Sequence, residues 1–297
     1  MTEACDEIHF IASILRVGSG CHGRWRRRPP GSDLPNIKAD GVLRHLGVPY
    51  ANFVTGSDDG MDVELIKGFA KYLGVKYEYI KTDWGSVVED LVGQKVIPTN
   101  GHAVLGEEVA VRGDLIANGF TMLPWRMEVL DYSEPTFPSQ IWLIARADSA
   151  VKPIKPSKNV ERDIDQAKRV IKDRDVLALE KTCLDPALYN LAATGARINN
   201  YGGNLNEMAP ALISKVAEFT ILDVPDALIA LEKWPGKIKI IGPISAPQTM
   251  AVGFPKSSPR LREAFNRYLE ETRQNGSYAR IIKYYYPTVS YYFPAFF

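Results

Sequence analysis

The stretch that decides the fold is GDLIANGFTMLPWR, residues 113–126. Its apolar beginning, 114–117, predicts a short buried strand. Pro124 suits the first turn of a helix, because its missing N–H has no intrahelical partner there. Arg126 then stands on that first turn, where its guanidinium offers paired donors that match a carboxylate. The stretch therefore predicts a strand, a tight connection and a helix that carries an anion-binding side chain.

Working outward, short apolar runs alternate with stretches of helical periodicity on the N-terminal side. Strands are predicted at 42–48 and 75–80, and helices at 62–73 and 84–91. Asp62 is placed to cap the first of these helices. Strands separated by helices imply right-handed crossovers and a mainly parallel sheet.

A second α/β unit follows on the C-terminal side. Strands are predicted at 176–179, 197–201, 219–222 and 238–241, and helices around 164–171, 188–191, 208–213 and 225–231. An extended segment at 249–254 then leads into a long helix that opens at Pro259. The chain thus predicts one α/β half, a second α/β half, and a segment that returns to the first.

Composition narrows the class of protein. The chain has 297 residues, 45% of them hydrophobic, with 36 Lys and Arg against 35 Asp and Glu. Such a balance gives no electrostatic footprint for nucleic acid, so no nucleic-acid partner is expected. Of the three cysteines, two lie before residue 22 and Cys183 is alone in the remainder, so neither a metal centre nor a cofactor is expected.

Residues 1–32 differ from the rest of the chain. The short apolar segment 8–17 follows acidic residues instead of the basic ones that open a secretory signal, and the basic, proline-containing 24–30 comes after it. We interpret 1–32 as a leader that is disordered or follows a misassigned start, and no signal peptide is evident.

Several motifs, read in order, resemble family 3 extracellular solute-binding proteins, the polar amino-acid receptors of ABC transporters. They are VPYANF (48–53), GMDVEL (60–65), the 113–126 stretch continued by LDYSEP (130–135), AVGFPKSSPRL (251–261), and NGSY (275–278) followed by Lys283-Tyr284-Tyr285. The resemblance runs from about Gly41 to Pro287. Each motif alone is unspecific, but the ordered set is specific.

The resemblance implies a type 2 periplasmic binding fold, in which two α/β lobes close on a ligand by a hinge motion. Lobe 1 would comprise 33–142 and 250–297, and lobe 2 would comprise 143–249. Gln140–Ala145 would carry the chain out of lobe 1, and Thr249–Phe254 would bring it back. A periplasmic monomer that delivers its ligand to an ABC transporter permease is expected.

The resemblance also assigns ligand-binding roles in lobe 1. Arg126 matches the arginine that grips the ligand carboxylate, and Thr121 matches the hydroxyl that shares it. Tyr50 matches an aromatic over the ligand, although a core tyrosine is the competing interpretation. Gly119 would bring its backbone close to the ligand. Leu123 departs from the family, whose threonine there caps the helix.

In lobe 2 the resemblance assigns the ligand contacts to Thr182, Cys183 and Asp223. Thr182-Cys183 matches a phrase whose backbone N–H groups, at a helix start, meet the carboxylate. Lys181 replaces the glycine usual before it. Asp223 matches the aspartate that pairs with the ligand's amino group, and it could also cap the helix that follows.

Two other classes of protein stay open. Cyclohexadienyl dehydratases share the fold, but they need a general acid in the cleft, and Glu180 and Asp185 do not match their pattern. A ligand-sensing domain, such as the module fused to lytic transglycosylases, is the other alternative. We therefore predict a binding protein that is not an enzyme.

Two segments have no assigned role. Residues 93–113 are predicted to form a long loop near the edge of the first sheet. The aromatic tail 291–297 is predicted to cover an apolar patch on lobe 1.

Overall fold

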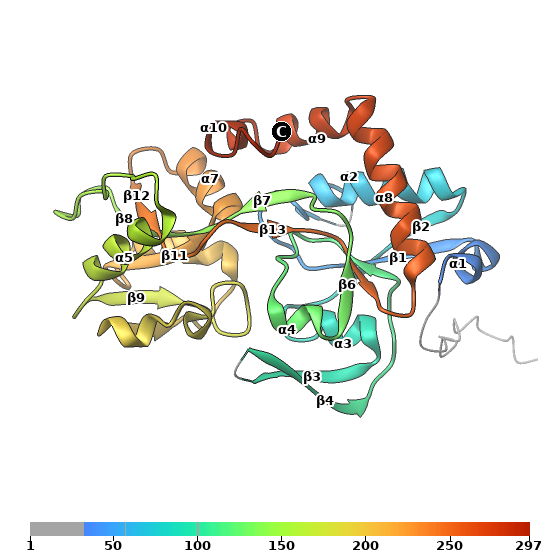
Figure 1. Cartoon of the computed structure of the whole chain (residues 1–297), viewed down its shortest axis with the longest axis horizontal. Coiled ribbons are helices and arrows are strands. Elements are labelled where there is room, and N and C mark those ends of the chain that lie inside the picture. The colour runs from blue at the N-terminus through green and yellow to red at the C-terminus, as the bar shows by residue number, and fades with distance from the viewer. Residues whose placement is uncertain (1–32, 57, 100) are drawn as a thin grey trace, which may run out of the picture.

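The computed structural model describes residues 33–56, 58–99 and 101–297, so the predicted leader at 1–32 lies outside the described residues. Within them, the strands form two five-stranded sheets and two two-stranded ones. Figure 1 shows the five-stranded sheets in two lobes, joined by a pair of crossing strands. The α/β class and the two-lobed fold predicted from the sequence are confirmed.

The first sheet has the order β2-β1-β5-β14-β6. Its strands are β1 (Val42–Gly47), β2 (Lys76–Lys81), β5 (Leu115–Ile116), β6 (Leu130–Tyr132) and β14 (Gly253–Pro255). β1 pairs in parallel with β2 and β5, whereas the returning strand β14 is antiparallel to both of its neighbours. The helices of this half are α1 (Leu34–Asp40), α2 (Met61–Leu73), α3 (Val87–Val92), α4 (Pro124–Met127), α8 (Pro259–Gln274) and α9 (Ser277–Tyr285).

The second sheet has the order β10-β9-β11-β8-β12. Its strands are β8 (Ile141–Arg146), β9 (Asp175–Ala178), β10 (Arg197–Asn200), β11 (Phe219–Asp223) and β12 (Ile238–Pro243). The outgoing strand β8 is antiparallel to β11 and β12, and β9 is parallel to β10 and β11. The helices of this half are α5 (Val160–Val170), the 3₁₀ turns η1 (Pro186–Tyr189), η2 (Leu191–Thr194) and η3 (Leu205–Glu207), α6 (Met208–Ile213) and α7 (Val224–Lys233).

The crossing between the lobes is an antiparallel pair, β7 (Phe137–Ser139) and β13 (Gln248–Met250). The predicted outgoing crossing at Gln140–Ala145 is wrong in position, because that segment is almost all strand β8, with hydrogen bonds to β11 and β12. The predicted return at Thr249–Phe254 divides into β13 and β14, which belong to different sheets. The lobe boundaries 33–142, 143–249 and 250–297 stay a prediction, since a paired crossing belongs to neither five-stranded sheet.

Residues 93–113 are not a loop but a hairpin of β3 (Gln94–Thr99) and β4 (His102–Glu108), seen at the bottom of Figure 1. Most of its side chains are exposed, and Val96 is the buried one in β3. Because the backbone pairing does not depend on a buried face, the stretch lacks the alternating pattern that predicts a strand.

Two local predictions are also wrong. Asp62 does not cap α2, because Gly60 takes the cap position and the Asp62 carboxylate instead accepts a hydrogen bond from the Gly119 backbone N–H at 2.7 Å. The helix predicted at 188–191 is two 3₁₀ turns, since Asn190 between them has a left-handed φ of 51°.

The aromatic tail packs against Trp142 in strand β8 of the second five-stranded sheet. Trp142 is the last residue of the predicted lobe 1, so the predicted contact of the tail with lobe 1 stays a prediction. α10 (Val289–Tyr292) extends from α9 toward α7 (Figure 1), and the rings of Tyr292 and Phe293 lie 5.2 Å and 6.5 Å from that of Trp142 in β8. Upstream, Tyr286 packs against Phe137 of the crossing. The C-terminal segment therefore contacts both lobes beside the crossing. Within the described ranges, no helix has the length and hydrophobicity needed to span a bilayer.

Candidate functional site

The residues predicted to bind a ligand gather where loops from the two sheets face each other. Tyr50 follows β1, Thr121 follows β5 and Arg126 lies on α4 in the first lobe. In the second lobe, Cys183 follows β9 and Asp223 ends β11. Loops at the carboxyl ends of parallel strands are the usual place for a ligand in open α/β sheets. The contacts described below connect these five side chains into one buried cluster.

Arg126 is the largest charged side chain in the cluster and is only 2% exposed. One guanidinium nitrogen donates to the Thr121 carbonyl at 2.9 Å, and the group lies 4.1 Å from the centre of the Phe120 ring. Its Nε has no hydrogen-bond partner, and no acidic side chain in the described ranges forms an ion pair with it. Burial lowers the pKa of Arg126. The site thus holds a buried cation that lacks an anion.

Leu123 precedes α4 and makes no capping hydrogen bond, as its side chain requires. The helix nevertheless forms with Pro124 at its first position, so the arginine keeps its place on the first turn.

Two polar side chains that follow β5 are buried with unused hydrogen-bonding capacity. The Thr121 hydroxyl is 1% exposed and has the weakly polar Cys183 thiol as its neighbour. The amide oxygen and nitrogen of Asn118, which is fully buried, have no hydrogen-bond partner within the described residues. A buried polar group without a partner costs roughly 1–3 kcal/mol, so a ligand that satisfies several of them gains that free energy.

Asp223 lies opposite, on the second lobe, and its carboxylate accepts hydrogen bonds from three groups. The Tyr50 hydroxyl donates to Oδ1, the Cys183 thiol lies 3.4 Å from Oδ2, and the Asp226 N–H caps onto Oδ1 at 3.4 Å. The predicted cap is therefore confirmed, and the same carboxylate faces the other lobe. Burial raises the pKa of Asp223, while the hydrogen bonds from Tyr50 and Cys183 oppose that rise.

Cys183 stands between the two charges of the cluster. Burial and the neighbouring Asp223 raise the pKa of its thiol, although Arg126 and Thr121 act in the opposite direction. The neutral thiol is a weak hydrogen-bond donor, so the structure gives Cys183 no nucleophilic character.

Thr182 has local partners instead of facing a ligand. Its hydroxyl donates to the Leu179 carbonyl at 2.8 Å and accepts from the Leu184 N–H at 3.0 Å, which closes a turn. No α-helix starts there, so the predicted arrangement of N–H groups at a helix start is wrong; the next helical turn is η1. Lys181 has a left-handed φ of 61°, the conformation for which the family uses glycine.

Gly119 is required by its surroundings. Its φ is +65°, and an added Cβ would lie 2.4 Å from the Phe53 ring. Its N–H is already bonded to Asp62, so the backbone group that it could offer a ligand is its carbonyl.

A cavity of about 580 Å³ opens beside the cluster, between the two lobes. We call it the front cavity; it is lined by 48–49 and 81–85 from the first lobe and by 179–182 and 203–207 from the second. Trp84 forms part of its wall and meets the Tyr50 ring edge-on at 5.5 Å. From the sequence, Trp84 is predicted only as part of a helix, yet its position just after β2, next to β1, could have indicated the site.

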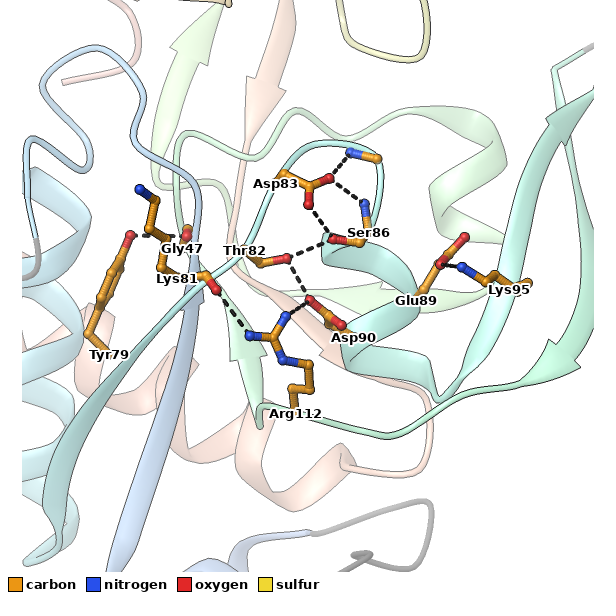
Figure 2. A network of polar contacts seen from close by, with 11 residues as sticks. Gly47, Tyr79, Lys81, Thr82, Asp83, Ser86, Glu89, Asp90, Lys95 and Arg112 are labelled. Atoms are coloured by element: carbon orange, nitrogen blue, oxygen red, sulfur yellow. Dashed lines mark hydrogen bonds and ion pairs between the residues drawn. The ribbon is translucent and has the colours of Figure 1, made fainter. Parts of the chain in front are cut away.

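The loop that holds Trp84 is fixed by the polar network of Figure 2. The Asp83 carboxylate accepts from the N–H groups of Gly85 and Ser86 at 2.8 Å and 3.0 Å. Behind it, Asp90 accepts from Thr82 at 2.5 Å and from Arg112 at 2.7 Å. These bonds brace the 81–85 wall of the front cavity.

Comparisons with known proteins agree with this fold. The family model of bacterial extracellular solute-binding proteins, family 3, matches residues 47–288. The chain therefore belongs to that family.

A curated relative is the membrane-bound lytic murein transglycosylase F of Desulfosudis oleivorans (strain DSM 6200 / JCM 39069 / Hxd3), 27% identical over 234 residues. The match covers 77% of this chain, which spans 44% of the relative's length.

Solved structures show the same fold at low sequence identity. A mutant of ArgBP from T. maritima is 19% identical, with a TM-score of 0.66, covering 86% of this chain and 99% of that one. An ancestral amino acid-binding protein, AncCDT-1, described as a precursor of cyclohexadienyl dehydratase, is 20% identical, with a TM-score of 0.65. The match covers 85% of this chain and 98% of that one.

Proposed function

We propose that this protein is an extracytoplasmic solute-binding protein that captures an amino acid or a related small carboxylate and presents it to an ABC transporter permease from the periplasm. The observation that carries the proposal is Arg126, a fully buried guanidinium without an anionic partner in the described residues. A ligand carboxylate would be that anionic partner and would form a bidentate pair with the guanidinium. The Thr121 hydroxyl and the Asn118 amide N–H would donate to the same carboxylate oxygens.

Asp223 extends the proposal from a carboxylate to an amino acid. Its carboxylate accepts from neutral donors only, the Tyr50 hydroxyl, the Cys183 thiol and the Asp226 N–H, and a ligand ammonium group would add a charged donor. Because Arg126 belongs to the first lobe and Asp223 to the second, a ligand that bridges them binds the closed form better than the open one. That difference in affinity is what would drive closure.

A thermal-shift screen of amino acids and small carboxylates tests the proposal. A ligand at one hundred times its dissociation constant should stabilise the protein by about 2.7 kcal/mol. Arg126→Met should abolish the shift, whereas Arg174→Met, which removes an exposed arginine paired with Glu218, should keep it. The proposal fails if no carboxylate stabilises the wild type, or if Arg126→Met binds as well as the wild type does.

A dehydratase is the second candidate, favoured by the likeness to the precursor AncCDT-1 and by carboxylates around the front cavity. Glu180, Glu207 and Asp83 all line that cavity, and Glu180 accepts a hydrogen bond from Asn200 at 2.5 Å. Assays of arogenate and prephenate turnover separate the two, since product formation that Glu180→Gln abolishes would establish an enzyme.

A ligand-sensing module is the third candidate, favoured by the relative of which this chain spans 44%. It would use the same ligand site, so the ligand screen would not distinguish it from a transport receptor. Co-purification with a permease, or with a murein-cleaving partner, would decide between the two.

A further inference from the structure

A second cavity lies between the lobes, separate from the front cavity. It has a volume of about 290 Å³, and we call it the rear cavity. The first lobe contributes 49, 51–52 and 54–55 to its wall, and the second lobe contributes residues of η3, α6 and α7. Pro49, Leu205 and Asn206 line both cavities and therefore form the wall between them. The Ala51 N–H closes this wall by donating to the Asn206 side chain at 3.0 Å.

The rear cavity contains a buried carboxylate without a counter-ion. Asp226 lines it, is 7% exposed, and has an Oδ2 atom with no hydrogen-bond partner within the described residues. No basic side chain in those ranges forms an ion pair with it. The cation at the rim, Lys233, is exposed and lies over the Trp234 ring at 4.9 Å. Asp226 thus lines the cavity with a carboxylate that has no ion pair, and its Oδ2 atom is buried without a hydrogen-bond partner in the described residues.

The neighbouring carboxylate makes this corner more negative. Asp223 lies one helical turn before Asp226 and accepts three hydrogen bonds, which favour its charged form. Burial and the charge of Asp223 raise the pKa of Asp226 well above its ordinary value. A cation bound in the cavity would oppose this rise in the pKa of Asp226 and favour the ionised form of both carboxylates.

We propose that the rear cavity is a second binding site, which takes a small organic cation with Asp226 as its counter-ion. An ammonium group in the cavity can form a charge-assisted hydrogen bond with the Asp226 carboxylate. Leu222, Ile229, Ala230 and Trp234 also line the cavity, and their apolar side chains suit a short alkyl chain. At about 30 Å³ for each water-sized unit, the cavity has room for roughly ten non-hydrogen atoms.

Occupation of this site favours the closed form. Both lobes line the cavity, so a cation bound there loses its contacts with one wall when the lobes separate. By linkage, a bound cation raises the affinity of the carboxylate site, and the carboxylate ligand raises the affinity for the cation by the same factor.

Titration calorimetry with butylammonium chloride, against sodium chloride of equal ionic strength, tests the proposal on the full chain. The wild type is expected to bind butylammonium with release of protons to the buffer. Asp226→Asn should raise the dissociation constant at least tenfold and abolish the proton release. Asp163→Asn is the matched control, because Asp163 is also 7% exposed and in the second lobe but lines neither cavity, and it should bind as the wild type does.

A second variant keeps the charge and reduces the space. Ile229→Phe enlarges a half-buried wall residue, and it should weaken butylammonium binding at least tenfold even if Asp226→Asn does not fold. Absence of butylammonium binding in the wild type would overturn the proposal, and so would equal binding by wild type, Asp226→Asn and Ile229→Phe. Arg126→Met should leave butylammonium binding intact, so failure of the carboxylate site and failure of the rear site are distinguishable.

Discussion

Replacing Arg126 by methionine should make the ligand-free protein more stable while it abolishes carboxylate binding. The wild-type guanidinium is 2% exposed and has one backbone acceptor, the Thr121 carbonyl, so most of its lost hydration is not recovered within the protein. Methionine has a similar length and fills the same space without a charge. The Thr121 carbonyl keeps a second donor, the Tyr132 hydroxyl at 3.2 Å, so it is not orphaned by the change.

The magnitude follows from four contributions of opposite sign. Burying an ion costs several kcal/mol after relaxation. Against this, the charged hydrogen bond contributes about 1.5–3 kcal/mol, and the contact with the Phe120 ring at 4.1 Å contributes about 1–2 kcal/mol. The Arg126→Met variant loses the charged hydrogen bond and the contact with the Phe120 ring. It also avoids the cost of burying an ion, and it adds apolar burial of about 1–2 kcal/mol. We expect a net gain of about 2 kcal/mol in the free energy of unfolding.

Urea denaturation of wild type and Arg126→Met, each with and without a carboxylate identified in the screen, measures both effects. The variant should have the higher midpoint without ligand and the same slope, and only the wild type should gain about 2.7 kcal/mol at one hundred times the dissociation constant. A loss of more than 2 kcal/mol in the ligand-free variant would refute the reasoning, because it would mean that the protein itself compensates the buried charge.

Three further predictions concern the first lobe. His45 is fully buried with its pKa lowered to about 4, so wild-type stability should fall by about 3 kcal/mol relative to His45→Gln as the pH drops from 6.5 to 4, measured by urea denaturation at each pH. Burial raises the pKa of Asp62 to about 7, so the protonated carboxyl stabilises the fold at low pH, and this stabilisation is lost as the pH rises through 7. Relative to wild type, the free energy of unfolding of Asp62→Asn should therefore rise by up to about 4 kcal/mol between pH 4 and pH 8. The same pH dependence of stability in both proteins would contradict this. Gly119→Ala should cost about 2–4 kcal/mol, because it needs a left-handed backbone and displaces the Phe53 ring; a thermal midpoint equal to wild type would rule this out.

The sequence predicted the elements whose side chains face a core. The strand of 219–222 is fully buried, and the helix that begins at Pro259 buries one face. Their apolar residues therefore follow the burial of each element, and the sequence pattern predicts both elements. The hairpin of 94–108 escaped prediction for the opposite reason, because its strands pair mainly with each other and most of their side chains are exposed.

The candidate site was predictable only through ordered motifs. The motifs place Arg126, Thr121 and Asp223 at the ends of predicted elements, and the structure brings all three into one buried cluster. The roles of Thr182 and Gly119 were harder to predict, because a hydroxyl that closes a turn and a glycine that relieves a ring contact look the same in a sequence as groups that meet a ligand.

By itself, then, the sequence determined the alternation of strands and helices, the two halves, and the charged residues at the strand ends. The tertiary structure alone decided which of those groups meet: the Tyr50 hydroxyl and the Asp223 carboxylate are 173 residues apart, and the tail at Tyr292 lies on Trp142 of the second five-stranded sheet. It also decided which buried charges lack partners, as Arg126 and Asp226 do within the described residues. The physical reason is that periodicity records burial along one element, whereas contacts between lobes depend on how two separately folded sheets are brought together by their crossing strands.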